Sequence, residues 1–137
     1  MIPDWAGRYV RLPFKDKGRG VEGFDCWGLV MHILEHEFKV SGLPDYSSTY
    51  AHTTDEDLIP IAIRDGLKEG YWNKVSEPKL GDMLIFNIGN KPMHCALVLG
   101  DGKMIHAQES IGITVDGYHR PNWKKRIEGF YRHDSLR

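Results

Sequence analysis

Apolar residues recur at helical spacing in the first half of the chain, most clearly from Asp25 or Cys26 to about Lys39. With about 100° of rotation per residue, the apolar side chains share one face and the polar side chains another. Asp25 suits the N-cap, and Gly42 followed by Pro44 favours an end to the helix. We therefore expect a helix whose first residue, Cys26, points inward. Its apolar face comprises Cys26, Leu29, Val30, Ile33 and Leu34, and its polar face comprises His32, Glu35, His36 and Lys39.

A second helix is expected after Thr53-Thr54-Asp55, which offers capping side chains, and it should end near Gly66. Pro60 weakens this expectation because proline is unfavourable inside a helix. From Leu80 onward, short β-type runs alternate with glycine-rich turns. The expected strands are Met83 to Ile88, Met93 to Leu99, Lys103 to Gln108, Ile111 to Val115 and Arg126 to Tyr131. Helices first and strands second indicate an α+β fold, with N-terminal helices packed on a C-terminal antiparallel sheet.

The composition fits one compact domain that spans residues 1–137. Of the 137 residues, 41% are hydrophobic and 27% are charged, which allows a real core and excludes disorder as the main state. The 18 basic and 19 acidic residues give a net charge of −1, so we expect no nucleic-acid partner. The sequence contains no apolar run long enough for a membrane span and no basic segment followed by an apolar one at its start. We therefore expect no membrane span, no secretory signal and a protein that is cytoplasmic as made.

Two cysteines, Cys26 and Cys95, are too few for a disulfide scaffold and need another explanation. At the first turn of a helix, unpaired N–H groups and the helix dipole favour a thiolate, which is the nucleophilic form of cysteine. Gly23 and Gly28 flank Cys26 and would let a substrate backbone come close. Cys26 is therefore a candidate nucleophile, and the alternative is an inert cysteine buried at a helix start.

A nucleophilic cysteine needs a base, and His94 and His106 lie in neighbouring expected strands. Whether the two histidines share a face of the sheet depends on the turn between the strands. A two-residue Asp101-Gly102 loop would place them on opposite faces. A three-residue Gly100-Asp101-Gly102 loop, with its last glycine left-handed in a bulge, would pair Ala96 with His106 and place both histidines on one face. The glycine content favours the three-residue loop.

On a shared face, His94 would act as the base to Cys26, and His106 would orient the His94 ring through its other nitrogen. The alternative for either histidine alone is a satisfied packing residue. Cys95 follows His94 in the same strand, so its side chain should point to the opposite face and fill the core. Because adjacent strand residues cannot both turn to one ion, we expect no metal site among these residues.

A short motif on the polar helix face offers a different chemistry. His32, Glu35 and His36 match the H-x-x-E-H pattern of one class of zinc peptidases, with two histidines on one helical face beside Lys39. The later carboxylate that should complete the zinc shell has no identifiable candidate. The pattern therefore favours a solvated helix face, and a zinc peptidase is kept as the minor alternative.

Four ordered segments resemble the successive motifs of the NlpC-type cell-wall cysteine peptidases. They are Gly23-Phe24-Asp25-Cys26-Trp27-Gly28-Leu29-Val30, Gly81-Asp82-Met83-Leu84-Ile85-Phe86, His94-Cys95-Ala96-Leu97-Val98-Leu99-Gly100-Asp101-Gly102 and Ile105-His106-Ala107. The resemblance implies a papain-like α+β fold in which Cys26 is the nucleophile, His94 the base and His106 the third polar residue, with no cofactor. It further implies cleavage of peptidoglycan stem peptides, typically next to γ-linked D-glutamate, through an acyl-enzyme. The resemblance also places Asp25 where it can hold the free amine of the stem peptide.

Two positions depart from the common pattern of the family. Trp27 stands where serine is usual, and Phe14 lies where many members carry a tyrosine whose hydroxyl helps to stabilise the oxyanion. Both residues are expected to contribute to substrate binding, and backbone N–H groups near Cys26 would have to stabilise the oxyanion. Trp27, the Trp5 to Phe14 segment and Gly129-Phe130-Tyr131-Arg132 most resemble the phage-tail branch of the family.

The resemblance to the phage-tail branch implies tail proteins as partners and a place on the virion, from which the enzyme would act at the bacterial cell wall. Two alternatives stay open. The fold could serve as a structural component of a tail, and activity of the isolated domain on murein peptides would separate the two readings. It could also transfer an acyl or amide group, which a non-peptide acyl donor would reveal.

Overall fold

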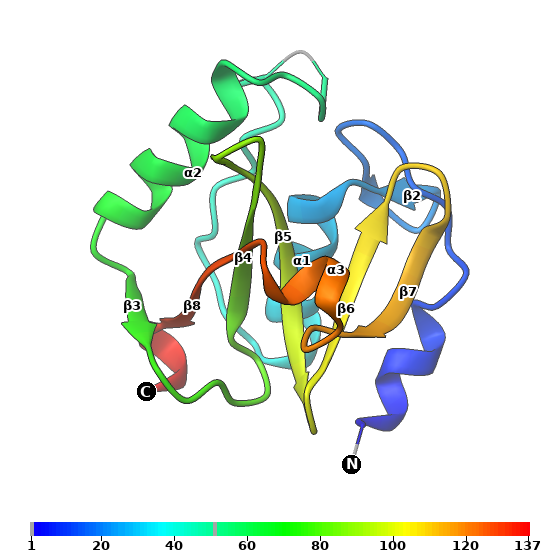
Figure 1. Cartoon of the computed structure of the whole chain (residues 1–137). Coiled ribbons are helices and arrows are strands. Elements are labelled where there is room, and N and C mark those ends of the chain that lie inside the picture. Colours follow the sequence, from blue (N-terminus) through cyan, green and yellow to red (C-terminus); the bar gives the residue numbers. More distant parts are fainter. Residues whose placement is uncertain (1, 51) are drawn as a thin grey trace.

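A computed structural model describes residues 2–50 and 52–137, and Figure 1 shows how its helices and strands are arranged. The N-terminal half contains η1 (Asp4–Arg8), β1 (Arg19–Gly20), β2 (Gly23–Phe24), α1 (Cys26–Glu37) and α2 (Leu58–Lys68). The C-terminal half contains β3 (Trp72–Val75), β4 (Met83–Ile88), β5 (Lys91–Gly100), β6 (Lys103–Gln108), β7 (Gly112–Gly117), α3 (Pro121–Lys124), β8 (Ile127–His133) and η2 (Asp134–Leu136). This order confirms the expected α+β class.

The strands of the C-terminal half form one antiparallel sheet in the order β3-β8-β4-β5-β6-β7. α1 contacts both β5 and β6, and α2 contacts β5. In Figure 1, α1 lies behind the sheet and α3 lies in front of it. The helix that begins at Cys26 is therefore held against the two strands that carry His94 and His106.

Both expected helices form, with small differences at their ends. α1 ends at Glu37, two residues before the expected end, and Lys39 already has a positive φ of 59°. α2 begins after Asp55, whose carboxylate accepts a hydrogen bond from the Leu58 N–H at 2.9 Å. Pro60 lies in the first turn of α2, where its missing N–H breaks no helical hydrogen bond.

The five expected strands also form: β4 and β6 have the expected bounds, and the ends of β5, β7 and β8 move by one or two residues. The sequence did not predict β1, β2, β3 or the short helix α3. Each of these elements has four residues or fewer, so none is long enough to show a hydrophobic period. They form because neighbouring strands and packed side chains supply their partners.

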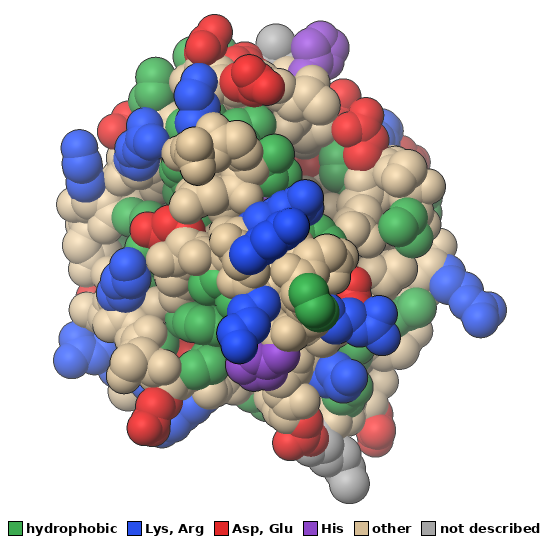
Figure 2. All heavy atoms as spheres, viewed as in Figure 1, with side chains coloured by type: hydrophobic (Ala, Val, Ile, Leu, Met, Phe, Trp, Pro, Cys, Tyr) green, Lys and Arg blue, Asp and Glu red, His purple; other side chains and the backbone are tan. Residues whose placement is uncertain are grey.

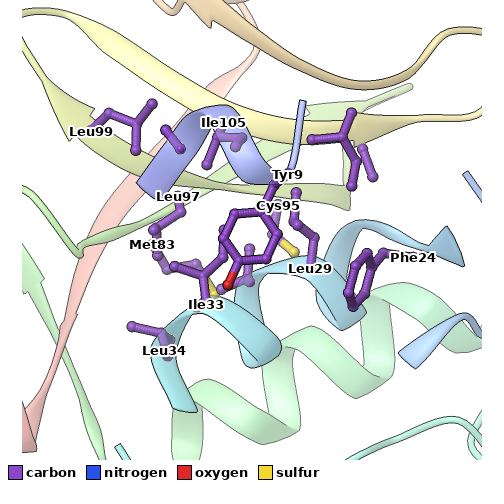
Figure 3. Packing of buried hydrophobic residues seen from close by; sticks show 14 of the residues in the cluster. Tyr9, Phe24, Leu29, Ile33, Leu34, Met83, Cys95, Leu97, Leu99 and Ile105 are labelled. Atoms are coloured by element: carbon purple, nitrogen blue, oxygen red, sulfur yellow. The ribbon is translucent and has the colours of Figure 1, made fainter. Parts of the chain in front are cut away.

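Buried side chains form two clusters on opposite faces of the sheet. The larger cluster joins α1 to the sheet, and Figure 3 shows Leu29 and Ile33 of α1 packed toward Leu97 and Ile105. The smaller cluster lies under α3 and comprises Leu84, Phe86, Ala96, Val98, Met104, Tyr118 and Trp123. Because successive residues of β5 enter different clusters, this strand is buried on both faces.

The hairpin between β5 and β6 differs from both loops that the sequence suggested. Asp101 and Gly102, with φ values of 54° and 74°, form a two-residue turn between the paired residues Gly100 and Lys103. A bulge between Val98 and Gly100 then adds one residue to β5. The bulge restores the register that a three-residue loop would give, so the histidines of the two strands share a face.

Beyond this hairpin, β5 and β6 separate. The pairing between them extends only to Leu97 and Ile105, whereas the first part of β5 pairs with β4 and the last part of β6 pairs with β7. Figure 1 shows the two strands diverging toward the end at which β6 stops.

The outer surface mixes side chains of all kinds. Figure 2 shows basic, acidic and apolar side chains interspersed over the face that carries α3. Lys124, Lys125 and Arg126 form an exposed basic run at the end of α3. Within residues 2–50 and 52–137, no helix is both long and apolar enough to span a bilayer.

Candidate active site

The site begins at the N-terminus of α1, where Cys26 is the first helical residue. The Asp25 carboxylate accepts a hydrogen bond from the Gly28 N–H at 2.7 Å and caps the helix as predicted. Gly28 allows a close approach of two backbone segments, because a Cβ there would lie 2.0 Å from the Gly18 carbonyl oxygen. This contact fixes the turn that presents Cys26.

The Asp25 carboxylate is fully buried and has two further donors. Arg19 Nη1 lies 2.7 Å from its Oδ1, and the Tyr50 hydroxyl donates to its Oδ2. Burial and the neighbouring Cys26 raise the pKa of Asp25, while the bonds from Tyr50, Arg19 and the Gly28 N–H oppose this rise. A substrate amine could reach the carboxylate only by displacing one of these donors. Asp25 is therefore a helix cap and an anchor, and its contact with a substrate amine stays a prediction.

The Cys26 side chain packs against the larger core cluster, to which Cys95 of β5 belongs. Cys95 and His94 are the neighbours that perturb its thiol. The neighbouring Cys95 thiol, followed by the His94 ring and its charge, lowers the pKa of Cys26 well below its usual value although burial opposes this. The same thiol contact and burial raise the pKa of Cys95.

Cys95 is a core residue as expected, and it also lies close enough to Cys26 to affect the pKa of that thiol. Cys95 does belong to the larger core cluster, on the face of β5 opposite His94. The strand alternation predicted that much correctly. It did not predict that Cys95 lies close enough to Cys26 to lower the pKa of that thiol.

The structure brings the two histidines together as predicted. His94 Nε2 lies 2.9 Å from His106 Nδ1. The His94 ring stacks on Phe86 and on Trp123, with ring centroids 5.8 Å apart in both pairs. His106 is fully buried, and burial, followed by the charge of His94, lowers the pKa of His106 to about 3. His106 is therefore neutral at pH 7, and His94 is the histidine that can exchange a proton with Cys26.

A cavity of about 690 Å³ adjoins Cys26, between α1, α2, their connecting loop and the sheet. Trp27 lines this cavity, donates from Nε1 to the Pro44 carbonyl at 3.0 Å and lies against the Tyr46 ring. Cys95 lines it as well. The substrate contact expected of Trp27 stays a prediction, and its place beside the cavity is compatible with it.

Phe14, the other residue expected to bind substrate, lies in a different environment. It forms an isolated bridge with Phe24 and packs, half-buried, against the larger core cluster. Its predicted contact with substrate stays a prediction.

The H-x-x-E-H residues lie on α1 with their histidines directed at each other. The rings of His32 and His36 stack with centroids 3.9 Å apart, and His36 Nδ1 lies 2.9 Å from the His32 carbonyl oxygen. In the two stretches that the structure describes, no three His, Cys, Asp or Glu side chains gather closely enough to hold a metal ion. The described residues thus supply no third ligand for the zinc alternative.

Four residues of the site were not identified from the sequence. Arg19 and Tyr50 bind Asp25, Cys95 contacts Cys26, and Trp123 packs on both histidines. Their partners are distant in sequence or belong to short elements, and periodicity does not report such contacts. The one usable signal was the position of Cys95 beside His94.

The sequence of this chain is similar to those of known proteins. The model of the NlpC/P60 family matches residues 11–132. The murein DD-endopeptidase MepS/murein LD-carboxypeptidase of Escherichia coli K12 is 28% identical over 123 residues, which cover 90% of this chain and 54% of that protein. A probable endopeptidase p60 of Listeria innocua is 32% identical, over 93% of this chain and 23% of that protein. The chain therefore spans about half, or less, of the length of these relatives.

Solved structures agree in fold. The NlpC/p60 domain of the peptidoglycan hydrolase SagA superposes with a TM-score of 0.63 at 22% identity, over 93% of this chain and 92% of that chain. A lipoprotein-like NLP/P60 family protein of Staphylococcus aureus Mu50 has a TM-score of 0.65 at 23% identity, over 95% of this chain and 39% of that one. Because the family model covers most of the chain and the architecture agrees, this chain belongs to the NlpC/P60 family.

Proposed function

We propose that this chain is a cysteine peptidase that hydrolyses a peptide bond in peptidoglycan stem peptides, next to γ-linked D-glutamate. The observation that carries the proposal is the 2.9 Å approach of His94 Nε2 to His106 Nδ1, with His94 close enough to Cys26 to lower the pKa of that thiol. The relatives support the substrate class, since one is a murein endopeptidase and another, from Bacillus subtilis, is a gamma-DL-glutamyl hydrolase that is 29% identical over 74% of this chain.

The proposed reaction has two stages. His94 takes the proton of Cys26, and the thiolate attacks the carbonyl carbon of the scissile bond. The tetrahedral intermediate collapses to a thioester on Cys26, and the departing amine receives the proton from His94. His94 then takes a proton from water, the resulting hydroxide attacks the thioester, and Cys26 is released with its proton restored.

The start of α1 can supply the oxyanion donors. The first N–H groups of a helix have no partner within the helix, and that of Gly28 is occupied by Asp25. The N–H groups of Cys26 and Trp27 lie at the nucleophile itself, so they are the donors proposed to stabilise the developing negative charge. These two backbone N–H groups would take the role of the tyrosine hydroxyl that many family members carry at the position of Phe14.

Digestion of purified sacculi followed by mass spectrometry tests the proposal. The wild-type protein should release fragments that identify the cleaved bond, and Cys26→Ala, Cys26→Ser and His94→Ala should release none. Cys95→Ser is the matched control, because it changes the other cysteine and keeps a hydrogen-bond donor beside Cys26. Intact sacculi after treatment with folded wild-type protein, or equal digestion by Cys26→Ala, would refute the proposal.

The proposal also includes an association of this chain with a phage tail. It rests on Trp27, on the Trp5 to Phe14 segment and on the closing Gly129-Phe130-Tyr131-Arg132 sequence. It includes tail proteins as partners and a place on the virion. Immunogold labelling of purified virions tests it directly, and labelling absent from the tail would contradict it.

A further inference from the structure

Asp116, near the end of β7, is an acidic residue to which the proposed reaction assigns no role. Two hydrogen bonds and one ion pair fix its carboxylate. The Trp123 indole donates to Oδ2 at 3.0 Å, the Gly117 N–H donates to Oδ1 at 2.9 Å, and Arg120 Nε lies 3.6 Å from Oδ1. The carboxylate is therefore fixed from the side of α3 as well as from its own strand.

The fixed carboxylate faces the second histidine of the site. His106 pairs with Thr114 across the two strands, so Asp116, two residues further along β7, lies diagonally opposite His106 on the same face. Asp116 Oδ2 lies 3.9 Å from His106 Nε2. Among the described residues, His106 Nε2 and Thr114 Oγ1 are the buried side-chain polar atoms without a hydrogen-bond partner. The free nitrogen of His106 thus has a carboxylate beside it.

We propose that Asp116 is a positioning residue that selects the tautomer of His106, placing the ring proton on Nε2. This inference rests on the proposed function for its catalytic meaning. With the proton on Nε2, Nδ1 of His106 carries a lone pair and accepts a hydrogen bond from His94 Nε2–H, across the observed 2.9 Å. The other nitrogen of His94, Nδ1, is then unprotonated and available to Cys26.

The opposite tautomer is disfavoured by charge. It would direct the lone pair of His106 Nε2 at the Asp116 carboxylate and a second N–H at His94. His94 would then carry its proton on Nδ1, where it could not accept the proton of Cys26. Asp116 therefore acts through two histidines on a thiol that it does not touch.

No proton needs to reach Asp116 during the reaction. The proton moves from Cys26 Sγ to His94 Nδ1 and later to the leaving amine, while His106 stays neutral in its buried position. The positive charge that appears on His94 strengthens its bond to His106 Nδ1, because a charged donor makes the stronger hydrogen bond. The negative charge of Asp116 stabilises the same state from further away.

Nitrogen-15 NMR of histidine-labelled protein tests the tautomer directly. In the wild-type protein, His106 should show a protonated Nε2 and an unprotonated Nδ1. In Asp116→Asn, and in Asp116→Ala as a second variant, the Nδ1-protonated form should become prominent. Arg120→Gln is the matched control, since it removes an exposed partner of Asp116 but leaves the carboxylate. A wild-type ring protonated on Nδ1, or the same tautomer in both Asp116 variants, would overturn the proposal.

Thr114→Val tests whether Thr114, and not Asp116, accepts the hydrogen bond from His106 Nε2–H. The Thr114 hydroxyl lies opposite His106 and could accept the Nε2 proton in place of Asp116. If Thr114→Val changes the tautomer and neither Asp116 variant does, the hydroxyl is the acceptor and the proposal is wrong.

Kinetics of the wild type and Asp116→Asn then test the consequence for catalysis. The variant should lower kcat about tenfold or more with little change in KM, since Asp116 lies away from substrate. The acid limb of its pH profile should move to lower pH, a change that a purely structural defect would not produce. If the wild type cleaves no peptidoglycan fragment, the proposed function fails, and the NMR result still decides the role of Asp116.

Discussion

His106 should make the stability of this protein depend on pH in a way that one substitution removes. Its ring is fully buried, and burial lowers its pKa from 6.5 to about 3. Because the unfolded chain binds the proton more readily than the folded chain, stability is complete above pH 6.5 and is lost as the pH falls toward 3. His106→Gln, which carries no titrating ring, should lack this part of the pH dependence.

The size of the effect follows from the two pKa values. A shift from 6.5 to about 3 corresponds to about 5 kcal/mol in full, of which about 2.5 kcal/mol should be lost between pH 7 and pH 4.5. Urea unfolding, followed by tryptophan fluorescence at both pH values, gives the free energy of unfolding for each protein. The loss of stability between the two pH values should be larger in the wild type than in His106→Gln by about 2.5 kcal/mol.

Each protein is judged by its change in the free energy of unfolding between the two pH values. A constant effect of the substitution on stability therefore cancels. His119→Gln is the matched control, because His119 is exposed and its replacement should leave the wild-type pH dependence intact. If Gln is not tolerated at the buried position, His106→Asn tests the same point. Equal losses in the wild type and in the His106 variants would show that His106 titrates freely, and the reasoning from burial would be refuted.

Three further outcomes are expected. Cys95→Ala should move the pH midpoint of Cys26 alkylation by iodoacetamide upward by about one unit, whereas Cys95→Ser keeps a donor and should retain it; equal midpoints in all three proteins would contradict the thiol contact. Gly28→Ala should lower the free energy of unfolding by about 1–3 kcal/mol in thermal melts, because its Cβ would collide with the Gly18 carbonyl. Iodoacetamide should abolish hydrolysis by labelling Cys26, and prolonged chelation should leave it intact; zinc that is lost and restored together with activity would instead favour the zinc alternative.

Local sequence signals were sufficient to predict the element that carries the nucleophile. Asp25 has a side chain suited to an N-cap, and the apolar spacing after it fits a single helical face, so the start of α1 at Cys26 was predictable. The five main strands were predictable for the same reason. Their periods and the glycine-rich turns between them depend on residues that are neighbours in sequence.

The sequence predicted only in part how His94 and His106 come to share a face of the sheet. The sequence predicted the correct outcome through a three-residue loop, but the structure reaches it through a two-residue turn at Asp101 and Gly102 and a bulge before Gly100. Relative to a regular two-residue hairpin, both solutions insert one extra residue, the expected one in the loop and the observed one in β5. The sequence therefore determined the register, and strand pairing decided where the extra residue is accommodated.

Tertiary structure alone decided the chemistry around the thiol. The packing of α1 against β5 brings Cys26 near Cys95 and His94, which lie on opposite faces of that strand. The burial that keeps His106 neutral and the approach of Asp116 to its free nitrogen likewise depend on how separate elements pack. The pKa of a group depends on the solvent and the charges around it. Residues far apart in sequence determine both. Sequence spacing could therefore identify Cys26 and His94 as candidates but could not predict their environment.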